Sequence, residues 1–186
     1  MKIKLAIFVT LAALSLGPGS ASAATTAYTE AGAFSLSKGA FGGGGFSFKV
    51  YSPIRVTELG FYALSIGANA DPHVYLWNVT TGKLLADSGS LQGHLKDEQW
   101  NYTILPTPIT LTPGDTYQIA SPAYFLKLYA NPLEFGCGSE INAIGFVNNE
   151  GWKAGWSQAA PYTNATIAPP VSANFKYEPV SKLPSK

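Results

Sequence analysis

The sequence has few residues of the kinds that carry reactive chemistry. Its 186 residues include one cysteine, Cys137, and two histidines, and only 12% of them are charged. A single cysteine excludes an intramolecular disulfide, and the sequence contains no C-x-x-C or H-E-x-x-H spacing that would indicate a zinc site. Cys137 lies between Gly136 and Gly138, with no Lys, Arg or His within two residues. We therefore expect a small buried residue in a tight turn rather than a reactive thiol.

The sequence also lacks an excess of basic residues, since 12 Lys and Arg face 11 Asp and Glu. This balance argues against a nucleic-acid partner. The apolar run from Leu5 to Leu16 is too short for a membrane span and follows two lysines. With the small residues that end at Ala23, it predicts a signal peptide over residues 1–23, cleaved after Ala23, and hence a secreted protein.

No sustained 3.6-residue apolar spacing follows the signal peptide, so long helices are not expected. Short runs of alternating apolar residues, separated by turn sequences, predict an all-β fold instead. We expect an antiparallel β-sandwich, jelly-roll or immunoglobulin-like, with about ten short strands. The sandwich should occupy residues 44–178. An N-terminal segment with a glycine-rich joint should precede it at 24–43, and a mobile tail should follow it at 179–186.

The sequence HVYLWNVTTGKLLADS, which begins at His73, predicts a β-hairpin at the centre of this sandwich. Val74 and Leu76 should point to one face of the first strand. Tyr75 and Trp77 should point to the other face, because side chains alternate along a strand. Gly82 stands where the connecting loop requires a left-handed residue.

Four successive motifs, GFSFKV, IRVTELGFY, HVYLWNVTTGKLLADS and WNYTILPTPITLTPGDTYQIAS, resemble a β-sandwich domain of unknown function from secreted and surface proteins of bacteria. Such domains are common among proteins with the PEP-CTERM sorting signal, and they occur beside carbohydrate-active modules. The resemblance implies a role at the cell surface or in the extracellular matrix. The sequence departs from the sorting signal after Glu178-Pro179, because no apolar anchor follows, and this implies a released protein.

Aromatic residues are the strongest indication of a ligand, since sugar rings bind to exposed aromatic faces beside amide and carboxylate groups. Trp152 and Trp156 occur in a glycine-broken stretch and could form such a platform or cap one end of the sandwich. Trp77 and Trp100, in regular strands, are expected in the core instead. The predicted polysaccharide-binding residues are Trp152, Trp156, Tyr162, Asn148, Asn149, His73 and Tyr75.

A structural calcium site is an alternative use of the acidic loops. The oxygen ligands would come from Asn69 and Asp71 or from Asp97 and Glu98, although their spacing is not that of an EF-hand. No other cofactor is expected.

Two further function classes stay open. A matrix or fibre subunit could self-associate through its edge strands, with residues 24–40 as a donated strand. A small secreted hydrolase could combine His73 or His94 with two carboxylates, but the G-x-S-x-G nucleophile motif is absent. Most acids lie in loops, where they favour turns. The sequence therefore predicts a non-catalytic binding or structural module whose partner is an extracellular polysaccharide or surface polymer.

Overall fold

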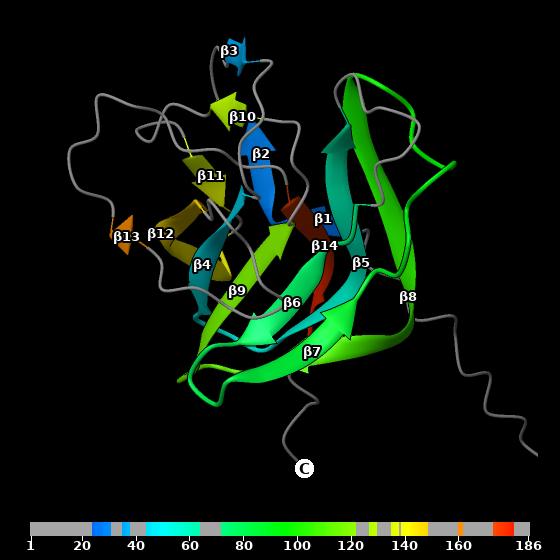
Figure 1. The fold of residues 1–186 in the computed structure, drawn as a ribbon. Helices are drawn as coiled ribbons and strands as arrows, with labels where there is room; N and C mark the ends of the chain where they lie inside the picture. The colour runs from blue at the N-terminus through cyan, green and yellow to red at the C-terminus, as the bar shows by residue number, and fades with distance from the viewer. Residues whose placement is uncertain are drawn as a thin grey trace, which may run out of the picture.

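The computed structural model describes residues 24–30, 35–37, 44–63, 72–121, 127–129, 135–137, 139–148, 160–161 and 173–180. These residues form the strands β1 to β14, and the two large sheets are antiparallel and pack against each other (Figure 1). The predicted all-β sandwich is confirmed. Within the described ranges, there is no helix long and apolar enough to cross a membrane.

The two large sheets draw their strands from distant parts of the chain. The four-stranded sheet has the order β1 (Thr25–Thr26), β14 (Ala173–Pro179), β5 (Ile54–Ala63) and β8 (Gln99–Leu111). The six-stranded sheet has the order β13 (Ala160–Pro161), β12 (Ile141–Asn148), β4 (Gly44–Val50), β9 (Thr116–Ser121), β6 (Tyr75–Asn78) and β7 (Lys83–Asp87). Both sheets therefore need long-range pairing, which alternating sequence patterns alone do not specify.

Two small two-stranded sheets complete the described structure. In one, β3 (Ser35–Ser37) pairs with β10 (Lys127–Tyr129), and in the other, β2 (Tyr28–Glu30) pairs with β11 (Phe135–Cys137). Residues 24–30 and 35–37 thus contain three short strands, β1, β2 and β3, within the predicted N-terminal segment.

The core lies between the two large sheets and is rich in phenylalanine. Phe46 and Phe48 of β4 face Phe175 of β14, with ring centroids 6.3 and 5.0 Å from that of Phe175. All three side chains are fully buried. Burial of this apolar surface, with the added preference of aromatic rings for tilted and offset contacts, holds the two sheets together.

The predicted central hairpin is present as β6 and β7. Tyr75 pairs with Asp87 and Leu76 with Ala86, and Gly82 has a positive φ of 68° as its loop position requires. Leu76 is fully buried in the core, whereas Tyr75 and Trp77, on the opposite side of the strand, are half-buried. The expectation that Trp77 belongs to the core is therefore wrong, because strand alternation turns it away.

Trp100 packs against the core, as the sequence predicted, although its side chain is only partly buried. Its ring meets that of the buried Tyr62 edge-on at 5.5 Å. The neighbouring Tyr102 covers Gly60, where a Cβ atom would lie 2.4 Å from the tyrosine ring. Glycine is therefore required at this close approach of the two strands.

The turn from β8 to β9 is fixed by Tyr117. Its hydroxyl donates to the carbonyl oxygen of Thr112 at 3.0 Å and accepts from the Thr112 amide at 3.1 Å. This arrangement is that of a tyrosine corner, which recurs at corners of immunoglobulin-like sandwiches. Gly114 within the turn has a φ of 107°, a conformation that L-residues rarely adopt.

β4 begins at Gly44. Two other features differ from the sequence expectations. Cys137, expected in a tight turn, is the last residue of β11. The C-terminal pairing extends through Pro179 of β14 to Val180, whose amide donates to the carbonyl oxygen of Pro53 at 3.0 Å.

Candidate functional site

The predicted binding residues fall in two groups. Four of them lie outside the described residues: Asn149, Trp152, Trp156 and Tyr162. Asn148 is the last residue of β12, where its backbone pairs with Gly44. Only His73 and Tyr75 are described with their side chains, so the candidate site is built from these two.

His73 and Tyr75 form a parallel pair of rings. Their centroids are 5.7 Å apart and their planes differ by 13°. Tyr75 begins β6 and His73 comes two positions before it, and this spacing places both side chains on the same side of an extended chain. The sequence prediction that these two residues share a surface is consistent with this geometry.

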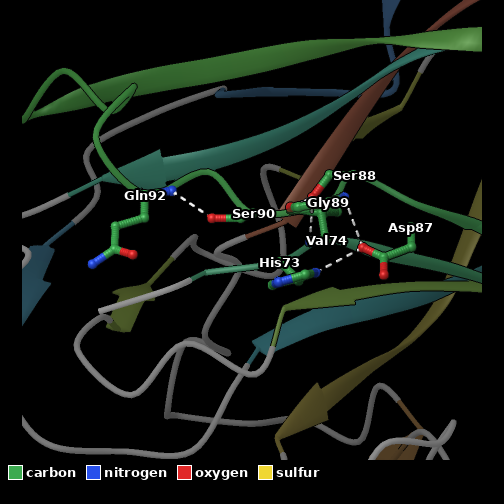
Figure 2. A network of polar contacts seen from close by, with 7 residues as sticks. All are labelled: His73, Val74, Asp87, Ser88, Gly89, Ser90 and Gln92. Atoms are coloured by element: carbon green, nitrogen blue, oxygen red, sulfur yellow. Dashed lines mark hydrogen bonds and ion pairs between the residues drawn. The ribbon is translucent and has the colours of Figure 1, made fainter. Parts of the chain in front are cut away.

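Asp87, which the sequence did not single out, anchors the histidine. His73 Nδ1 lies 2.8 Å from Asp87 Oδ1, and the Gly89 amide donates to the same oxygen at 2.8 Å (Figure 2). Asp87 stands opposite Tyr75 in the β6–β7 register, and its side chain is 39% exposed. Both bonds use Oδ1, so Oδ2 can accept a hydrogen bond from a ligand.

The segment after β7 is tied to the start of β6 by a second set of bonds, also seen in Figure 2. The Ser88 amide donates to the Val74 carbonyl oxygen, and the Val74 amide donates to Ser88 Oγ, both at 2.9 Å. Ser88 Oγ donates in turn to the Gly89 carbonyl oxygen at 2.8 Å. Because these bonds fix the backbone on both sides of the His73–Asp87 contact, the imidazole and carboxylate are held in place before any ligand arrives.

Trp77 extends this surface along β6. It is two residues beyond Tyr75, so its ring lies on the same side of the strand. Its Nε1 is buried and, among the described residues, is the one buried side-chain nitrogen or oxygen without a hydrogen-bond partner. A buried donor without a partner costs free energy. His73, Tyr75 and Trp77 are hereafter called the aromatic row.

The sequence contains the signal that identifies this row, namely three ring-bearing residues at alternate positions before and along one strand. The same alternation predicts that Tyr75 and Trp77 share one face of the strand, although the size of the tryptophan favoured a place in the core. Asp87 could not be found in this way, since its place beside Tyr75 depends on the hairpin register.

The second pair of calcium candidates lies elsewhere. Asp97 and Glu98 are exposed in the turn before β8. Two hydrogen bonds fix the backbone of Glu98. Its amide donates to the Ala63 carbonyl oxygen at 2.7 Å, and its carbonyl oxygen accepts from the Tyr62 hydroxyl at 3.1 Å. The described part of the chain contains no group of three His, Cys, Asp or Glu side chains that could hold a metal ion. Asn69 and Asp71 lie outside it, and the calcium site stays a prediction.

Comparison of the whole chain with models of known protein families gives no match, and a search of curated proteins also finds none. The resemblance to the PEP-CTERM-associated domain therefore stays a prediction. Arguments about function rest on the geometry of the described residues.

Proposed function

We propose that this protein is an exported, non-catalytic module that binds a polysaccharide through the aromatic row. The observation that carries the proposal is the parallel stacking of His73 on Tyr75 beside a half-exposed, prepositioned carboxylate. Export is supported by the signal-peptide pattern of residues 1–23.

The spacing of the row suits a chain-like ligand. Alternate residues on a strand are about 6.6–6.8 Å apart, so rings at three successive alternate positions provide an extended series of apolar surfaces. Each ring can accept the C–H face of a sugar by apolar contact. A polymer that contacts several rings gains affinity from each of them, whereas a single sugar can use only one.

A carboxylate beside the row supplies a directional contact for a hydroxyl group. Asp87 Oδ2 is an acceptor, because both hydrogen bonds to this carboxylate use Oδ1. Asp87 is paired with His73, which partly balances its charge whenever the imidazole is protonated. A neutral or weakly charged polysaccharide therefore fits this surface better than a strongly charged one.

The proposal is tested by binding of the processed protein, residues 24–186, to a panel of soluble and insoluble polysaccharides. The Tyr75→Ala variant removes the central ring, and we expect about tenfold weaker binding, equivalent to about 1.4 kcal/mol. The matched control is Tyr51→Ala, because Tyr51 is 66% exposed at the turn between β4 and β5, away from the row.

The variants Trp152→Ala and Trp156→Ala test the other part of the predicted platform in the same assay. Loss of binding in Tyr75→Ala alone supports the aromatic row. Loss only in the tryptophan variants would move the site to the stretch around residues 152–156 and contradict the row. If the native protein binds none of the polysaccharides, the proposed function is wrong.

A further inference from the structure

The described residues of the N-terminal segment, 24–30 and 35–37, pair with strands from the second half of the chain. Thr25 pairs with Tyr177 in β1–β14, Tyr28 with Cys137 in β2–β11, and Ser35 with Tyr129 in β3–β10. Figure 1 shows β1, β2 and β3 each beside its partner strand. All three pairings are antiparallel, and the partners are separated by about 90 to 150 positions in the sequence.

This N-terminal segment, residues 24–37, contributes to the core as well as to the sheet edges. Ala27 is fully buried, and its amide donates to the Phe175 carbonyl oxygen at 2.8 Å. Its neighbours Phe175 and Tyr177 on β14 are fully buried too. Without the segment, β14 would become an open edge with unpaired backbone groups beside the core, and such an edge readily captures another strand.

We infer that the N-terminal segment exchanges between copies of this chain, so that β1, β2 and β3 of one molecule pair with β14, β11 and β10 of another. The occupant of these edges and its register are read directly from the pairing within one chain. An exchanged segment would form the same backbone hydrogen bonds and bury the same Ala27. The inference does not depend on polysaccharide binding.

The balance between the two arrangements is set by concentration, because the contacts themselves are identical. Pairing within one chain is favoured by an effective concentration that is about millimolar for short flexible connections. In the sequence, six residues, 38–43, separate β3 from β4. Cleavage after Ala23, as the sequence predicts, would leave the segment attached to the rest of the chain at one end only. It could then separate from β14, β11 and β10 without passing through a closed loop of the chain.

The single cysteine makes the exchange directly measurable. Tyr28 and Cys137 are Cα partners in an antiparallel pair, a separation of about 4.5–5.5 Å that a disulfide can span. A chain with Tyr28→Cys and Cys137→Ser, carrying an affinity tag, is mixed with the untagged native chain. The mixture is refolded from denaturant at several total concentrations and oxidised. A disulfide between positions 28 and 137 can then form only between two different molecules.

The matched control is a tagged chain with Tyr51→Cys and Cys137→Ser, which exposes a thiol outside the pairing register. We expect the covalent heterodimer to form in several-fold higher yield with Tyr28→Cys than with the control, and its share to rise with concentration. Peptide mapping should locate the bond between positions 28 and 137. Equal yields from both variants at the highest concentration would overturn the inference.

A third variant tests the register on which the inference depends. Tyr28→Cys alone, with Cys137 retained, should form a disulfide within one molecule at low concentration. Absence of that bond under conditions that oxidise free thiols would show that β2 does not pair with β11 and would also overturn the inference. Binding to polysaccharides can be measured on the same native chain, so failure of one proposal leaves the other to be judged on its own data.

Discussion

The imidazole of His73 lies parallel to the phenol ring of Tyr75 while its Nδ1 contacts Asp87 at 2.8 Å. One side chain thus belongs both to an apolar stack and to a polar pair. The stack provides the surface on which a sugar can lie, and the polar pair fixes the orientation of the imidazole. The two roles can be separated by substitution.

Replacement of His73 by phenylalanine should retain most of the polysaccharide affinity. His73→Phe keeps a flat ring over Tyr75 but removes the bond to Asp87, whereas His73→Ala removes both. We expect affinity within about threefold of the native value for phenylalanine and about tenfold weaker binding for alanine, measured by calorimetry. Asp87→Asn, which keeps an acceptor oxygen, serves as the control. Equal losses for phenylalanine and alanine would show that the imidazole acts through its nitrogens.

Removal of the Tyr117 hydroxyl should destabilise the fold without changing its shape. Tyr117→Phe deletes both bonds to the Thr112 backbone, and we expect the free energy of unfolding to fall by about 1–2 kcal/mol in urea denaturation. Tyr51→Phe is the control, because that side chain is 66% exposed, and it should change stability by less than about 0.5 kcal/mol. An unchanged midpoint for Tyr117→Phe would mean that the corner contributes nothing to stability.

The sequence predicts the strands whose patterns are local. The hairpin of β6 and β7 is marked by alternation and by Gly82. Pro106 and Pro108 lie in β8, an edge strand, where the register to β5 is interrupted. Proline within a sheet favours such positions, because it cannot donate a backbone hydrogen bond. These features depend on nearest neighbours along the chain.

The sequence could not predict features that depend on distant pairing. β1 and β2 contain too few residues to show an alternation of apolar and polar side chains. They form strands because their backbones pair with the edges of β14 and β11. The proximity of Asp87 to His73 likewise follows from the hairpin register. Trp77 was assigned to the core from its size, but alternation along β6 turns its side chain away from the core.

Addition of a methyl group at Gly45 should be among the most destabilising small substitutions in the sheet. A Cβ at this position would lie 2.0 Å from the Ile119 carbonyl oxygen and 2.6 Å from the Ala120 Cα, so β4 and β9 would have to separate. We expect Gly45→Ala to lower the free energy of unfolding by about 3 kcal/mol. Lys49→Ala, at an exposed position of the same strand, should cost less than about 0.5 kcal/mol. Similar stabilities of the two variants would contradict the close approach.

Acid should weaken a contact that links the turn before β12 to β14. The Tyr177 hydroxyl donates to Glu140 Oε2 at 2.8 Å, and mainly for this reason the pKa of Glu140 is lowered from its ordinary value of 4.5. A carboxylate whose pKa is depressed by folding stabilises the protein fully above that ordinary value. The contribution is then lost as the pH falls through the folded-state pKa.

A double-mutant cycle of Glu140→Gln and Tyr177→Phe should therefore show a pH-dependent coupling. Urea denaturation at pH 6 should give a favourable interaction between the two side chains, because the ionised carboxylate accepts a hydrogen bond from the hydroxyl. At pH 3 the same cycle should give a smaller coupling, since protonation weakens Glu140 as an acceptor. Equal coupling at both pH values would show that the hydroxyl does not distinguish the two protonation states, and that the lowered pKa of Glu140 has another cause.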